Sequence, residues 1–113
     1  MKYNDSILKP PGPIISVIVR PAGRASPTRT RLGELDTGSD ITVIPQSLVK
    51  ALRLVPKYPV VMSGYDDAET ERWAYLVDME LADCILETIK VVAVPRKTIL
   101  LGRDVLNHFV VTL

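Results

Sequence analysis

The residues best suited to chemistry are residues 36–39 (Asp-Thr-Gly-Ser), which stand between two apolar stretches. Leu35 precedes them and residues 41–44 (Ile-Thr-Val-Ile) follow, a pattern typical of two buried strands joined by a tight loop. All four residues are ordinary turn formers, so a turn without function is one interpretation. A carboxylate between buried strands is costly unless it is paired or hydrogen-bonded, which makes Asp36 a candidate for catalysis.

The other reactive side chains give little support for a different hydrolytic chemistry. Cys84 and His108 are the only cysteine and histidine, and they are far apart in sequence. The chain has no Gly-x-Ser-x-Gly motif and no cysteine or histidine spacing that suits a metal. The acidic residues 66–71 indicate a solvated hairpin, with a weak calcium site as the minor alternative. Carboxylate chemistry without a metal or cofactor is therefore predicted.

A second segment completes a resemblance to a known family. Residues 35–39 resemble the catalytic loop of the aspartic proteases, and residues 99–104 (Ile-Leu-Leu-Gly-Arg-Asp) resemble the second signature of their retroviral branch, the retropepsins. The motifs stand in the family's order and at about its separation, and the resemblance covers roughly residues 14–113. It implies an all-β, retropepsin-like barrel with one or two short helices, and an aspartic endopeptidase.

The number of Asp-Thr-Gly motifs bears on the assembly. Carboxylate hydrolysis of an amide needs a base for the water and an acid for the leaving group, and two carboxyls that share a proton supply both. This chain holds a single Asp-Thr-Gly, so the second Asp36 must come from another copy in a two-fold symmetric homodimer. The resemblance implies the same arrangement, with a peptide or protein as substrate.

The resemblance also implies a role for each residue of the catalytic loop. Asp36 holds and activates the water. Thr37 ties the two loops together across the dimer through its hydroxyl. Gly38 lets the substrate backbone approach and accepts a hydrogen bond from it. The hydroxyl of Ser39 can donate to the Asp36 carboxylate, which would favour the charged form of that carboxylate.

Outside this loop, the resemblance implies an ion pair and a flap. Asp40 is expected to bind substrate backbone and to pair with Arg103; a buried structural bridge is predicted over an exposed pair worth under ~1 kcal/mol. Residues 62–73 align with the flap that closes over the substrate, and Gly64 and Tyr65 are candidate substrate-binding residues. This flap is acidic, and the chain stops where the family's final interface strand would begin. A catalytically weak or inactive dimerisation or peptide-binding module is therefore the alternative function.

The apolar pattern predicts the elements that position these motifs. Strands are predicted at residues 14–19, 30–35, 40–44, from 60, 73–81, 85–94, 99–101 and 109–113, and helices at residues 45–54 and 103–108. Alternation places Trp73 on the same face as Tyr75 and Val77. Residues 20–31 carry four arginines, but no interleaved aromatic residue, which favours a solvated loop over a nucleic-acid contact.

Length and composition fit one domain preceded by an arm. The 113 residues suffice for one core, and a net charge of +1 gives no field that favours nucleic acid or an anionic membrane. Residues 1–13 are polar and proline-rich, without the apolar stretch of a signal peptide or a bilayer span. The prediction is an N-terminal arm at residues 1–13, a protease domain at residues 14–113, and a cytoplasmic location.

Overall fold

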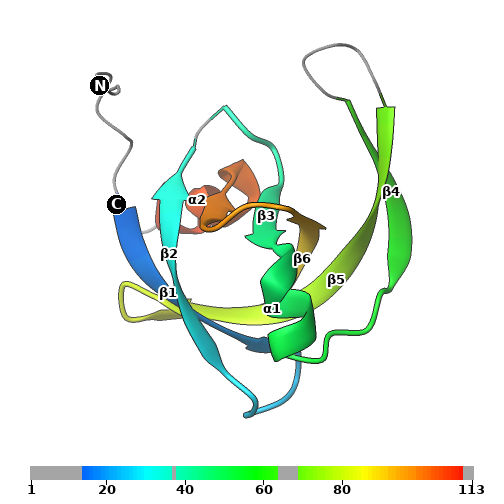
Figure 1. Ribbon diagram of the computed structural model, residues 1–113. Helices are drawn as coiled ribbons and strands as arrows, with labels where there is room; N and C mark the ends of the chain where they lie inside the picture. Colours follow the sequence, from blue (N-terminus) through cyan, green and yellow to red (C-terminus); the bar gives the residue numbers. More distant parts are fainter. Residues whose placement is uncertain (1–13, 37, 64–68, 111–113) are drawn as a thin grey trace, which may run out of the picture.

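The structure is a computed structural model that describes residues 14–36, 38–63 and 69–110. Seven strands and two helices lie in this part of the chain (Figure 1). In order they are β1 (Ile14–Pro21), β2 (Arg29–Leu35), β3 (Thr42–Pro45), α1 (Gln46–Ala51), β4 (Tyr58–Ser63), β5 (Glu69–Leu81), β6 (Cys84–Val94), β7 (Ile99–Leu101) and α2 (Arg103–Val110). Neither helix is long and apolar enough to cross a membrane.

Six of the strands close into a barrel in the order β1-β2-β7-β3-β6-β5, because β5 returns to pair with β1. The closing contact is antiparallel and aligns Ile18 with Glu80 and Pro21 with Val77. Strand β4 extends the sheet beyond β5 and forms with it the long hairpin at one side of the barrel (Figure 1). The predicted all-β barrel with short helices is confirmed.

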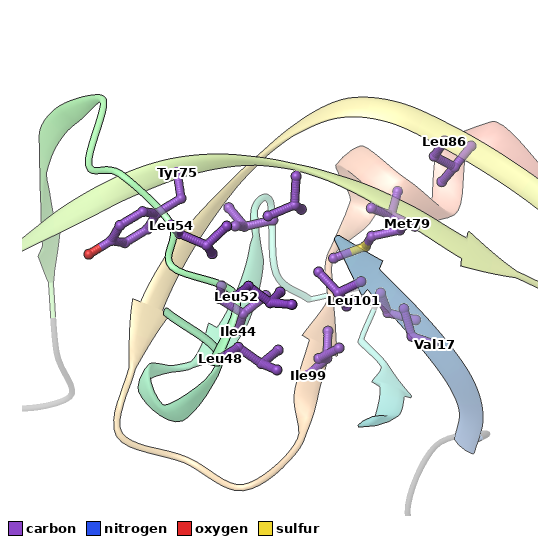
Figure 2. Packing of buried hydrophobic residues seen from close by; sticks show 14 of the residues in the cluster. Val17, Ile44, Leu48, Leu52, Leu54, Tyr75, Met79, Leu86, Ile99 and Leu101 are labelled. Carbon is purple, nitrogen blue, oxygen red and sulfur yellow. The ribbon is translucent and has the colours of Figure 1, made fainter. Parts of the chain in front are cut away.

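The core fills the barrel with apolar side chains from nearly every element (Figure 2). Alternate residues of β1 and β5 are fully buried, among them Val17, Val19 and Met79, as the two-residue period of a strand requires. Helix α1 adds Leu48, which is fully buried. The same core includes Leu101 of β7, so the strand beneath the Asp-Thr-Gly loop rests on packed side chains.

Helix α1 is shorter than the predicted residues 45–54. It ends because Arg53 takes a left-handed backbone conformation with a φ of 54°. The Arg53 N–H then donates to the Lys50 carbonyl over 3.2 Å, and the Leu54 N–H donates to the Val49 carbonyl over 2.9 Å. These two bonds form a Schellman motif, and Leu54 folds back into the core as that motif favours.

Helix α2 corrects the predicted strand at residues 109–113. Residues 109 and 110 belong to α2, and the remainder of that prediction lies outside the described residues. The β-branched residues at 110–112 favoured a strand by propensity. The packing of Val105, which is fully buried, and of Leu106 against the core holds the segment as a helix instead.

The face of β5 that carries Trp73, Tyr75 and Val77 is buried only within the barrel. Trp73 is 51% exposed because it pairs with Pro59 in the hairpin beyond the closed ring. A bulge interrupts the register between Val77 and Met79, and Asp78 is 5% exposed. Its carboxylate accepts hydrogen bonds from the backbone N–H groups of Gly23 (3.1 Å) and Thr88 (2.8 Å).

The predicted arginine-rich loop at residues 20–31 is shorter in the structure, because β1 extends to Pro21 and β2 begins at Arg29. Arg20 lies in β1 and forms a 3.2 Å ion pair with Glu80 of β5. Arg29 and Arg31 lie in β2 and donate to neighbouring backbone carbonyls. The predicted arm at residues 1–13 lies outside the described residues, and its boundary stays a prediction.

Candidate active site

Asp36 stands at the end of β2, where the β2–β7 pairing continues one residue past the strand. Leu35 is in register with Leu101, and the Asp36 N–H donates to the Leu101 carbonyl over 3.0 Å. The Gly38 N–H donates to Asp36 Oδ1 over 2.9 Å, and the Ser39 N–H donates to the Asp36 carbonyl over 3.3 Å. Backbone bonds on both sides thus fix the orientation of a carboxylate that is only partly buried.

The connection between β7 and α2 forms the floor of this loop. The Arg103 N–H donates to the Ser39 carbonyl over 2.7 Å. Gly102 lies so close to the backbone of Ile41 that a Cβ atom on it would stand 2.7 Å from the Ile41 carbonyl carbon and oxygen. Since backbone atoms cannot move aside as a side chain can, only glycine fits at this position.

A buried hydrogen-bond network joins the loop to the start of α2. Thr42 is fully buried, and its hydroxyl donates to Asp104 Oδ1 over 2.7 Å and accepts from the Gly102 N–H over 3.1 Å. The Thr42 N–H donates to Asp104 Oδ2 over 3.2 Å. Sequence reasoning missed both residues. The available signals were a polar residue inside the apolar run 41–44 and an acidic residue in the first turn of a helix.

Replacing Thr42 by valine should destabilise the protein by about 2–3 kcal/mol. Valine keeps the size of threonine, but it leaves the Gly102 N–H and one Asp104 oxygen without the hydroxyl that they contact. The serine variant is the matched control, because it keeps the hydroxyl and loses one methyl group, worth about 1 kcal/mol. Urea unfolding of both variants is the measurement. Equal losses would contradict a hydroxyl-based role.

Two predicted side-chain contacts turn out differently in the structure. Arg103 Nη2 does pair with Asp40 Oδ1, but the two side chains are 55% and 82% exposed, so the pair is not the buried bridge that was predicted. At such exposure an ion pair contributes little to stability. The Ser39 hydroxyl donates to the Ile41 carbonyl over 2.9 Å, and its single proton is therefore not directed at the Asp36 carboxylate.

Three of the predicted site residues, Thr37, Gly64 and Tyr65, lie outside the described residues. The strands that flank the predicted flap are described: β4 and β5 pair as far as Ser63 opposite Glu69. Asp66 and Asp67 of the acidic hairpin are likewise not described. Within residues 14–36, 38–63 and 69–110, no three His, Cys, Asp or Glu side chains are grouped to hold a metal ion.

A cavity of about 280 Å³ lies elsewhere, between the β1–β2 connection and the segment that follows α1. Its basic lining residues are Arg24, Arg53 and Lys57, and its lining includes no carboxylate. A second hollow, of about 370 Å³, shares Arg24 and Arg53 with it. These hollows therefore do not supply the groups that a carboxylate reaction needs.

Comparisons with known proteins bear on the family and the fold of this chain. A family model described as "Aspartyl protease" matches residues 29–105, which include Asp36, Gly102 and Asp104. No curated protein matches the sequence. The solution structure of the simian foamy virus (mac) protease is similar in fold, with a TM-score of 0.65 and 16% sequence identity over 87% of this chain and 96% of the viral chain.

Proposed function

Since this chain belongs to the aspartyl protease family and has a retropepsin-like fold, we propose that two copies of it form an aspartic endopeptidase. The observation that carries the proposal is the placement of Asp36. Its carboxylate stands at the end of β2, partly exposed, and is oriented by the 2.9 Å bond from the Gly38 N–H. Each chain brings one such group, so a two-fold axis at the loop would pair it with the Asp36 carboxylate of the second copy.

The reaction would proceed through the two carboxyls, one ionised and one protonated. The ionised Asp36 takes a proton from a water whose oxygen attacks the peptide carbonyl carbon, and the protonated one donates its proton to the carbonyl oxygen. The resulting tetrahedral gem-diol collapses when the Asp36 that took the water proton donates it to the amide nitrogen, the other carboxylate takes a proton from a gem-diol hydroxyl, and the C–N bond breaks. Because backbone bonds already orient the carboxylate, little reorganisation is needed at the moment of attack.

Further residues would act around this pair. Gly38 is exposed beside the carboxylate, which suits close approach of an extended peptide backbone. Asp40 is 82% exposed and next to the loop, so it can bind substrate backbone in addition to Arg103. The cross-dimer role of Thr37 and the flap role of Gly64 and Tyr65 rest on the family resemblance of the sequence. No cofactor or metal enters this proposal.

Mixing experiments test whether the site is shared between chains. Wild-type protein is mixed with Asp36→Asn protein, and hydrolysis of an excess of denatured protein substrate is followed from acidic to neutral pH. With random pairing, the activity per wild-type chain should fall to roughly one half at an equal ratio, and to roughly one tenth at a ninefold excess of variant. Dilution of wild-type protein alone should also lower the activity per chain.

Two outcomes would count against the proposal. If folded Asp36→Asn protein leaves the activity per wild-type chain unchanged at every ratio, the site belongs to a single chain. If wild-type protein hydrolyses no substrate at any pH, the alternative function gains support, a dimerisation or peptide-binding module without proteolysis.

A further inference from the structure

The face of the barrel that carries Asp36 also carries a second acidic residue, Glu34. Strand residues alternate between faces, and Gly33 and Leu35 point toward the core. Glu34 therefore lies on the opposite face, which it shares with Asp36 two residues later. At the usual rise of a strand, their Cα atoms are about 6.6 Å apart. A substrate residue bound next to the scissile bond would lie within reach of Glu34.

Apolar residues flank Glu34 on both neighbouring strands. Leu100 of β7 is in register with Glu34, and it lies on the same face because Ile99 and Leu101 are fully buried on the other. On β1 the partner of Glu34 is Ile14, which is 53% exposed. The carboxylate thus lies between two hydrophobic side chains on the face where the substrate would bind.

Two polar side chains from the β6–β7 connection hold this carboxylate. The Thr98 hydroxyl donates to Glu34 Oε2 over 2.6 Å, and Arg96 Nη2 donates to the same oxygen over 3.1 Å. Arg96 is itself held by Thr98, through 2.9 Å to its carbonyl and 3.1 Å to its hydroxyl. Within the part of the chain that the structure describes, Oε1 of Glu34 receives no hydrogen bond. The Glu34 side chain is 33% exposed, so Oε1 has access to a ligand.

Resting on the proposed protease function, we propose that Glu34 determines specificity at the residues that flank the scissile bond. Its free Oε1 selects a neutral side chain that donates a hydrogen bond, such as that of glutamine, asparagine, serine or threonine. An aliphatic side chain would remove water from Oε1 and leave the oxygen unpaired, which opposes binding. Arg96 already compensates the charge of Glu34 and would repel a lysine or arginine side chain.

Two-fold symmetry extends the inference to both sides of the scissile bond. Each copy of the chain contributes one cluster of Glu34, Arg96 and Thr98, related to the other by the axis that pairs the two Asp36 residues. The preference for neutral donors should therefore occur at the residue before the bond and at the residue after it.

A peptide library tests the inference. The peptides vary only in the two residues that flank the cleaved bond, and kcat/KM is measured for the wild type, Glu34→Leu and Glu34→Gln. Wild-type protein should cleave glutamine-containing peptides about tenfold better than leucine-containing ones. Glu34→Leu should reverse that order. Glu34→Gln places an NH2 donor at the position of Oε1 and should admit glutamate, which the wild type disfavours.

Glu80→Gln is the matched control, since Glu80 is also a strand carboxylate paired with an arginine, Arg20, at 3.2 Å. Glu80→Gln should leave unchanged the ratio of kcat/KM for glutamine-containing peptides to kcat/KM for leucine-containing peptides. Melting curves of all variants show which of them are folded. A wild-type preference for leucine, an unchanged order of the two peptides in folded Glu34→Leu, or no gain of glutamate cleavage in folded Glu34→Gln would overturn this inference while the protease function stands. If the wild type cleaves no peptide in the library and no denatured protein, the proposed function fails and this inference with it.

Discussion

Replacing Asp36 by asparagine should lower the hydrolysis of denatured protein by about 10²- to 10⁴-fold, and leave the barrel folded. Asparagine has nearly the size of aspartate, and its amide oxygen can still accept the bond that the Gly38 N–H makes to Oδ1. It cannot take a proton from water, so the proposed dimer would lose its general base. The measurements are kcat/KM across acidic to neutral pH and the melting temperature of each protein.

Asp83→Asn is the matched control for this experiment. Asp83 is exposed in the tight turn between β5 and β6, where its φ of 64° suits asparagine as well as aspartate. The control should keep the wild-type rate. If Asp36→Asn protein hydrolyses substrate as fast as the control does, the reaction does not use the Asp36 carboxylate.

Replacing Gly102 by alanine should destabilise the protein by about 3 kcal/mol or more, because the added Cβ would collide with backbone atoms. That Cβ would stand 2.7 Å from the carbonyl carbon and oxygen of Ile41 and 3.0 Å from its nitrogen. The loop cannot retreat without breaking the bonds that Thr42 makes to Gly102 and Asp104. For a domain of this size the melting temperature should fall by about 10 °C or more.

Activity measured well below the melting temperature of the Gly102→Ala variant should also fall, since a displaced loop would misplace Asp36. Gly33→Ala is the matched control in the neighbouring strand. Its Cβ would approach only side-chain atoms, at 2.9 Å from Val17 Cγ2 and 3.2 Å from Leu101 Cδ1, and no backbone atom. A loss near 1 kcal/mol is expected there. Equal melting temperatures for the two variants would contradict the close approach at Gly102.

The features that sequence reasoning identified correctly depend on local patterns. The apolar runs of β6 and β7 predicted these strands to within one residue of their observed bounds. Alternation predicted the end of β5 correctly, but β5 begins at Glu69, four residues before the predicted start. The Asp-Thr-Gly segment, read together with residues 99–104, indicated the fold and the two segments that meet around Asp36. The local pattern also predicted the short helix α2, but with its end at residue 108 instead of Val110.

The features that sequence reasoning missed depend on contacts between distant segments. The Ser39 hydroxyl donates to the Ile41 carbonyl because the folded chain places that carbonyl within hydrogen-bond distance. The exposure of the Asp40–Arg103 pair follows from the surface position of the β7–α2 junction. The burial of Thr42 against Asp104 needs the register of two segments 62 residues apart. Propensity and periodicity carry no information on any of these three contacts.

The long-range hydrogen bonds that support the Asp-Thr-Gly loop have a consequence for folding and synthesis. The bonds that hold Asp36 and Thr42 reach residues 101–104, more than 60 residues further along the chain. Contacts of such sequence separation must overcome the entropy of closing a long loop, so we expect them to form late in folding. During synthesis the Asp-Thr-Gly loop leaves the ribosome long before β7 and α2 exist to support it. Under the proposed function, a growing chain would therefore not yet hydrolyse neighbouring proteins, and proteolytic activity would begin only when the barrel is complete.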